Sequence, residues 1–123
     1  MNKKVIVFGG SGFLGNYVVS ELVNRGYNVI AADLKIPQYN TEVDFVECDI
    51  MNTEDVQNAL SSDIDYVYNL AGFSQLEKAH LEPKTTINLN VIGNINILNA
   101  CVENKVKRVV YASSAYAVSE KGS

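Results

Sequence analysis

The chain has 123 residues, 47% hydrophobic and 20% charged, which is enough for one globular domain and too little for two. Its formal net charge is -4 and its ten Lys and Arg residues form no cluster, so nucleic acid is not an expected partner. Because no apolar run approaches the roughly 20 residues of a membrane span, and the first run is too short for a signal peptide, we expect a cytoplasmic protein that does not bind a membrane.

Strand and helix signals alternate along the chain. In chain order, the predicted elements are a strand at 4–8, a helix beginning at 14 and ended by Gly26, a strand at 27–32, a strand at 43–46, a short helix capped at 52–53, a strand at 64–70, a long helix at 83–104 and a strand at 108–112. The first strand is a continuous β-branched and aromatic run, which is typical of a strand buried on both faces.

The helices are predicted from apolar residues at helical spacing. In the first helix these are Leu14, Val18 and Leu22. In the long helix, which begins with Pro83, one stripe is formed by Ile87, Val91, Ile95, Leu98 and Val102. Ile92 and Ile97 then belong to the outer side of that helix.

This alternation predicts an α/β fold. Buried strands separated by helices form a parallel sheet with helices on both faces, the three-layer, doubly wound Rossmann architecture. Right-handed crossovers favour the strand order 3-2-1-4-5. Since such domains usually continue to a sixth strand, we expect residues 1–123 to be one incomplete domain, truncated after strand five, of a longer protein.

A glycine-rich turn lies between the first strand and the first helix. Gly9, Gly12 and Gly15 form G-x-x-G-x-x-G, which permits a tight exit from the strand, approach of a dinucleotide pyrophosphate to the backbone, and close packing of the helix. Asp33 follows at the end of the next strand, where a carboxylate accepts hydrogen bonds from ribose hydroxyls and repels a 2′-phosphate. NAD is therefore favoured over NADP, although the cation of Lys35 keeps NADP open.

The two cysteines do not indicate a reactive or metal site. Cys48 and Cys101 lack the close spacing of a zinc knuckle or a redox pair. We expect two buried free thiols and no metal.

Four further motifs follow the glycine turn in order: Asp49–Ile50, Leu70 to Ser74, Asn90 to Gly93, and Lys107 to Ser114. Together with the turn, they resemble the extended short-chain dehydrogenase/reductase family, the group that contains sugar-nucleotide epimerases and dehydratases. The resemblance covers essentially the whole chain. It implies an NAD-dependent enzyme that acts on a sugar nucleotide by transient hydride transfer. It also implies a homodimer paired through the long helix and the helix that follows it, in a four-helix interface.

The resemblance also implies site residues. Ser114 is expected to hydrogen-bond the reacting sugar hydroxyl or carbonyl, since a serine hydroxyl both donates and accepts. The expected cofactor-binding residues are Gly9, Gly12, Phe13, Leu14, Gly15, Asp33, Leu34, Asp49, Ile50, Leu70, Ala71, Gly72, Ser74 and Asn90. A polar residue such as Asn90 on an apolar helix can instead bond only to backbone.

The chain departs from the family pattern at the catalytic base. The family uses a tyrosine with a lysine four residues later, and none of the seven tyrosines has lysine at that spacing. Tyr116 is closest in place, but Glu120 occupies its fourth position. We expect the missing pair beyond Ser123, and the 123-residue chain alone to be inactive. Asn94 also replaces the usual threonine of the helix motif.

Two other functions share these motifs. A non-catalytic dinucleotide-binding sensor would keep the cofactor site and lack the base. A reductase of ketones would belong to the same family, because the motifs do not specify the substrate.

Overall fold

The computed structural model describes residues 2–40, 42–61, 63–71 and 88–112. The elements are β1 (Lys4–Phe8), α1 (Phe13–Asn24), β2 (Asn28–Asp33), β3 (Asp44–Glu47), α2 (Thr53–Ala59), β4 (Tyr66–Asn69), the π-helical turn η1 (Asn88–Ile92), α5 (Gly93–Glu103) and β5 (Arg108–Tyr111). The strands form one parallel sheet in the order β3-β2-β1-β4-β5, which confirms the predicted fold class and strand order.

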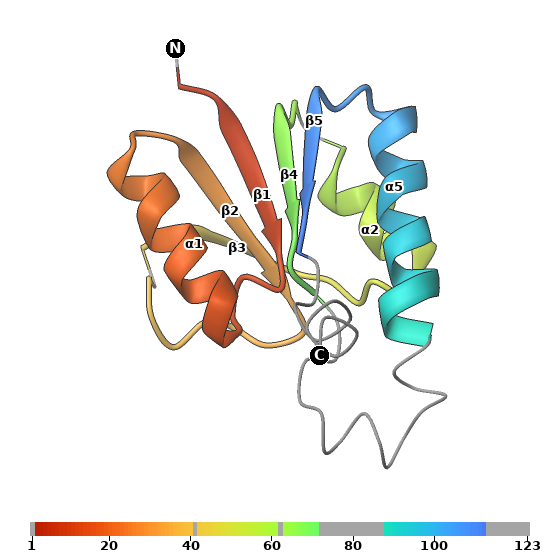
Figure 1. Ribbon diagram of the computed structural model, residues 1–123, viewed down its shortest axis with the longest axis horizontal. Coiled ribbons are helices and arrows are strands. Elements are labelled where there is room, and N and C mark those ends of the chain that lie inside the picture. The colour runs from red at the N-terminus through yellow and green to blue at the C-terminus, as the bar shows by residue number, and fades with distance from the viewer. Residues whose placement is uncertain (1, 41, 62, 72–87, 113–123) are drawn as a thin grey trace, which may run out of the picture.

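Helices cover both faces of this sheet (Figure 1). Alternate residues of β1 divide the core: Val5 and Val7 pack with Val19 and Leu22 of α1, whereas Ile6 and Phe8 belong to a larger cluster with α2 and α5. All four β1 side chains from Val5 to Phe8 are fully buried. The central strand is therefore buried on both faces, as its continuous apolar run predicts.

The helix ends follow local capping rules. Gly26 has a φ of +88°, and the N–H groups of Gly26 and Tyr27 donate to the carbonyls of Val23 and Leu22 at 3.0 and 3.1 Å, so α1 ends in a Schellman motif. Asn52 caps α2, because its side-chain oxygen accepts from the N–H of Asp55 at 3.1 Å.

The predicted orientation of α5 is wrong. Its predicted stripe is the solvent side, with exposures of 50% for Val91, 48% for Ile95, 41% for Leu98 and 78% for Val102. The buried residues of α5 are instead Gly93, Ile97, Ala100 and Cys101, so Ile97, expected on the outer side, lies in the core. These are mostly small residues, which bring the helix axis close to the sheet. Pro83 and Ile87 lie outside the described residues.

A smaller error of the same kind occurs in α1. Leu14, predicted on the core face, is 52% exposed, and the buried residues are Gly15, Val19 and Leu22. The helix is therefore rotated so that Gly15 faces the sheet. This rotation brings the start of α1 against the glycine turn.

Candidate functional site

The turn after β1 is held by the neighbouring strands. Gly9 has a φ of +81°, and its N–H donates to the carbonyl of Ala32 at 2.8 Å. A Cβ added at Gly9 would lie 2.7 Å from the carbonyl carbon of Leu70 and 2.8 Å from the nitrogen of Ala71. The backbone after β4 therefore occupies the space that a side chain would need, and the expected tight exit from β1 is seen here.

Gly15 and Gly12 have opposite surroundings. A Cβ at Gly15 would lie 2.0 Å from the carbonyl oxygen of Gly9, whereas one at Gly12 would meet only that oxygen, at an ordinary 3.4 Å. Gly15 is buried and Gly12 is exposed. The packing of the protein itself therefore requires a glycine at position 15 and does not require one at position 12.

The start of α1 is available to an anion. No side chain among the described residues caps this end, and its first turn carries no acidic residue. The N–H of Asn16 donates to the carbonyl of Gly12 at 2.9 Å, so the backbone N–H groups of Phe13 and Leu14 precede the first intrahelical bond of the helix. Both side chains are exposed, 83% for Phe13 and 52% for Leu14. Backbone N–H groups at a helix start and the helix dipole together favour a negative group at this position.

Asp33 lies at the carboxyl end of β2, next to the glycine turn. Its Oδ2 accepts from the backbone N–H of Ser11 at 3.0 Å and its Oδ1 from the N–H of Leu34 at 2.7 Å. The Ser11 hydroxyl donates to the carbonyl of Lys35, so Ser11 donates two hydrogen bonds from the turn to the chain at the end of β2. The sequence did not single out Ser11, because its partners lie more than 20 residues away. Two backbone donors fix the Asp33 carboxylate at the sheet edge.

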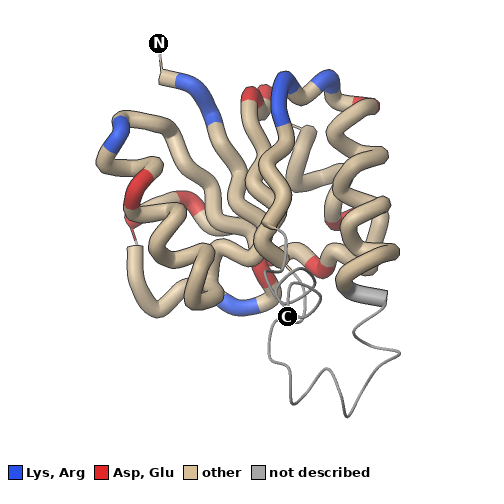
Figure 2. Tube along the Cα trace, viewed as in Figure 1, with Lys and Arg blue, Asp and Glu red and all other residues tan. Residues whose placement is uncertain are grey.

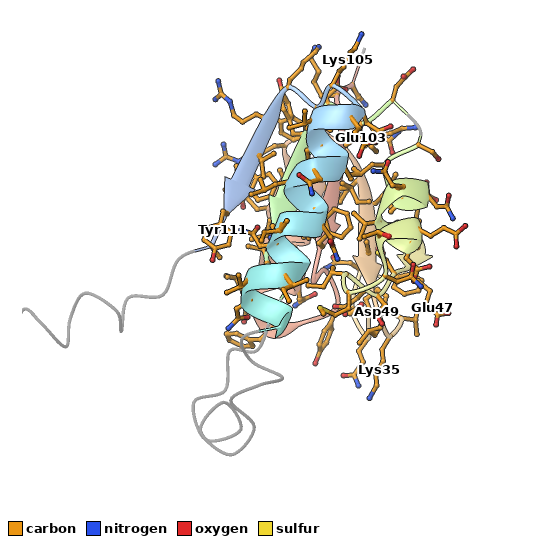
Figure 3. The ribbon with its side chains drawn as sticks, turned by 90° about the vertical axis from the view of Figure 1, so that its right-hand side faces the viewer. Lys35, Glu47, Asp49, Glu103, Lys105 and Tyr111 are labelled. Carbon is orange, nitrogen blue, oxygen red and sulfur yellow. The ribbon has the colours of Figure 1, made fainter. Side chains whose placement is uncertain are left out.

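Asp49 and Ile50 follow β3 at the same edge. Asp49 Oδ1 accepts from the N–H of Met51 at 3.0 Å, and its own N–H donates to Asp55 Oδ2 at 3.1 Å. Ile50 is buried and belongs to the larger core cluster. Figure 3 shows Asp49 and Lys35 projecting from the same end of the molecule.

Beyond β4, the described chain includes Leu70 and Ala71, both half-buried. The N–H of Leu70 donates to the carbonyl of Phe8 at 2.9 Å, which continues the pairing of β4 with β1. Asn90 is half-buried in η1. The other predicted site residues, Gly72, Ser74 and Ser114, lie outside the described residues.

Charge is distributed unevenly over the molecule. Among the described Lys and Arg residues, Lys35 alone lies near the carboxyl ends of the strands, and the others gather toward the opposite end (Figure 2). Acidic side chains, Asp33 and Asp49 among them, accompany Lys35. Within the part of the chain that the structure describes, attraction of a phosphate to this edge therefore depends on backbone N–H groups and the exposed cation of Lys35.

Both thiols are buried, as the sequence predicts. Burial raises the pKa of Cys48 to about 12, with the carboxylates of Asp55, Asp49 and Asp33 adding to the effect, and raises that of Cys101 to about 11. Both therefore stay protonated near neutral pH, which is unfavourable for nucleophilic chemistry.

Within the described ranges, no group of three His, Cys, Asp or Glu side chains is placed to hold a metal. No helix in these ranges is long and apolar enough to cross a membrane.

The sequence of this chain matches a known protein family. The family model described as NAD dependent epimerase/dehydratase family matches residues 5–123. The chain belongs to this family. The match includes every element of the sheet edge described above.

Curated relatives of this family member include UDP-glucose 4-epimerases. That of Lactobacillus helveticus is 34% identical over 117 residues, which is 91% of this chain and 36% of the relative. That of Rickettsia prowazekii is 29% identical over 133 residues, 96% of this chain and 38% of the relative. The chain therefore spans little more than a third of the length of the relatives it matches.

Solved structures of the family share the fold. The UDP-glucose 4-epimerase of Thermotoga maritima, solved with UDP-glucose, matches with a TM-score of 0.85 at 29% identity, covering 93% of this chain and 38% of that one. The UDP-glucose 4-epimerase of Thermus thermophilus, solved with NAD, matches with a TM-score of 0.83 at 28% identity, covering 90% and 37%.

Proposed function

We propose that this chain is the NAD-binding portion of a sugar-nucleotide epimerase that acts by transient hydride transfer. The proposal rests on the surroundings of Gly12. The packing of the protein does not require a glycine at this position, which lies at the start of α1. A Cβ there would occupy the space through which a pyrophosphate approaches the backbone. The residues present therefore fit a dinucleotide.

Each part of the sheet edge has a role in this proposal. The N–H groups at Phe13 and Leu14 bind the pyrophosphate, and Asp33 accepts from the hydroxyls of the adenosine ribose. Asp49 and Ile50 flank the adenine. When bound, NAD would supply reversible hydride transfer, a redox chemistry that the side chains of the protein do not provide. The protein side chains orient the dinucleotide and the reacting sugar.

The relatives support a proposal for the substrate class. Those named above are UDP-glucose 4-epimerases, and the Thermotoga maritima structure contains UDP-glucose. A UDP-sugar is therefore the first substrate to test. Ser114 is proposed to hydrogen-bond the reacting sugar hydroxyl. The predicted location of the protein remains the cytoplasm.

Calorimetric titration beside a UDP-glucose turnover assay tests the proposal. We expect the 123-residue chain to bind NAD and to show no turnover, because no tyrosine has lysine four residues later and losing a general base costs about 10² to 10⁴ in rate. Circular dichroism of the same sample establishes that it is folded. Turnover by this chain would contradict the assignment of the base, and a folded chain that binds no NAD would contradict the proposed function. NAD binding without turnover also fits a dinucleotide sensor, and activity of a longer protein separates the two.

We further propose that the protein pairs through α5. The exposed apolar residues of this helix and η1 form one stripe, consisting of Val91, Ile92, Ile95, Leu98 and Val102. A contiguous apolar surface of this kind is typical of an interface between subunits.

Light scattering at increasing micromolar concentrations tests this pairing. We expect a dimer fraction that rises with concentration, and its loss in Leu98→Lys, because a charge at the centre of the stripe would be buried without a partner. Val23→Lys places the same charge at a similarly exposed apolar position on α1 and serves as the control. A monomer at every concentration, or equal effects of both substitutions, would refute the interface.

A further inference from the structure

Two asparagines on α5 each hold one of the loops at the sheet edge. Asn94 is bonded to Asn69 at the end of β4, and Asn96 is bonded to the carbonyl of Ile50 after β3. Both asparagines are half-buried. The two contacts reach different strands, so the two side chains constrain different parts of the edge.

The bond between Asn69 and Asn94 has a defined direction. Asn69 is 3% exposed, and its Oδ1 accepts from the backbone N–H of Ala71 at 3.3 Å. Because a backbone N–H can only donate, the other end of the Asn69 amide is its donor, and Nδ2 donates to Asn94 Oδ1 at 2.6 Å. Asn94 thus supplies the acceptor that keeps Asn69 turned toward Ala71.

The Ala71 N–H lies in the peptide that packs against Gly9. A Cβ at Gly9 would come within 2.8 Å of both the Leu70 oxygen and the Ala71 nitrogen. A change in the orientation of this peptide would therefore alter its packing against the glycine turn. The chain of contacts runs from Asn94 through Asn69 to the backbone after β4.

Asn96 has the corresponding role on the other side of β1. Its Nδ2 donates to the carbonyl of Ile50 at 2.8 Å. The Ile50 side chain fills the space of the missing Gly93 side chain, where a Cβ would lie 2.5 Å from its Cδ1. Ile50 is held by α5 through both its carbonyl and its side chain.

The strand order separates the two loops. Asp33 and Ile50 follow β2 and β3, whereas Ala71 follows β4, and β1 lies between these two groups. With neighbouring strands about 4.8 Å apart, the loops after β3 and β4 are roughly 14 Å apart, so they would contact different parts of an extended ligand. If Asp33 binds the adenosine ribose, the nicotinamide half lies over β4.

We propose that Asn94, acting through Asn69, positions the peptide that supports the nicotinamide half of NAD, and that Asn96 positions the residue beside the adenine half. This inference rests on the proposed function. Both asparagines are positioning residues, since each acts through another part of the chain.

Titrations with NAD and with AMP, which lacks the nicotinamide half, distinguish the two roles. We expect Asn94→Ala to weaken NAD binding about tenfold, because it leaves the buried Asn69 donor without its acceptor, and to change AMP affinity less than twofold. Asn96→Ala should weaken NAD and AMP by the same factor. Asn94→Asp keeps an acceptor oxygen at the same position and should restore most of the NAD affinity. A general loss of structure would weaken the binding of both NAD and AMP in both alanine variants.

Each outcome bears on one proposal. Equal losses of NAD and AMP affinity in Asn94→Ala, or no loss of either, would overturn the role of Asn94 and leave the proposed function standing. Failure of the unsubstituted chain to bind NAD and AMP would overturn the proposed function itself. If Asn94→Ala does not fold, Asn94→Ser replaces it in comparison with Asn94→Asp, because the shorter serine hydroxyl does not reach Asn69.

Discussion

Gly15→Ala is expected to destabilise the fold more than any other single methyl addition in the glycine turn. The new Cβ would lie 2.0 Å from the carbonyl oxygen of Gly9 and 2.8 Å from the Cα of Gly10, both of them backbone atoms. Gly9 cannot move away, because it is bonded to Ala32 on one side and packs against the Leu70–Ala71 peptide on the other. Ordinary overpacking costs about 1–3 kcal/mol, and we expect a larger loss here.

Thermal unfolding followed by circular dichroism measures this loss. The midpoint should fall by roughly 10 °C or more, since a domain of this size loses several degrees per kcal/mol. Gly12→Ala is the matched control: its Cβ has one ordinary contact, so the midpoint should change little while NAD binding is lost. Unfolding temperatures that shift equally in the two variants would show that the close approach at Gly15 is not a constraint.

Asp33→Ala is expected to lower NAD affinity about 10- to 100-fold and to narrow the preference for NAD over NADP. The carboxylate is fixed by the N–H groups of Ser11 and Leu34, which leaves its remaining lone pairs for two ribose hydroxyls. Hydrogen bonds to a charged group contribute about 1.5–3 kcal/mol, and the same charge repels a 2′-phosphate. Parallel calorimetric titrations with NAD and NADP measure both effects.

A carboxylate elsewhere provides the control for Asp33. Asp44 is exposed at the amino-terminal start of the neighbouring strand β3, so Asp44→Ala removes the same charge from the opposite end of the sheet and should leave both affinities unchanged. Tighter or equal binding of NADP by the unsubstituted chain would show that the cation of Lys35 dominates over Asp33.

The fold could be predicted from the sequence because its signals are local. Continuous apolar runs ended by Gly9 or by Asp33 mark buried strands, and the rule of right-handed crossovers leaves few orders for five parallel strands. The glycine turn was predicted on the same basis, since G-x-x-G-x-x-G between a strand and a helix has a backbone explanation at each position. The structure shows that explanation directly at Gly9 and Gly15.

The face that α5 turns to the sheet could not be predicted in this way. Apolar residues occur on both sides of the helix, and the stripe with the larger side chains is the exposed one. What determines the packing is the small size of Gly93 and Ala100, together with the fit of Gly93 to Ile50. Periodicity identifies apolar faces, but it does not rank two of them by how closely each approaches a sheet.

The supporting contacts of the site were also missed. Ser11, Asn69 and Asn96 look like ordinary polar residues in the sequence, because their partners lie far along the chain. The position of Asn69 gave a usable signal, since a polar residue at the end of a fully buried strand needs a partner. The identity of that partner depends on tertiary structure.

These distant partners also determine when a binding-competent edge appears during folding. The hydrogen bonds that join its parts span 22 residues from Ser11 to Asp33, 25 from Asn69 to Asn94 and 46 from Ile50 to Asn96. Each of these bonds closes a long loop, and the entropic cost of closure comes before the contact can contribute. No isolated helix or strand therefore contains the assembled site. Such topologies fold slowly, and affinity for a dinucleotide arises only as the sheet is completed.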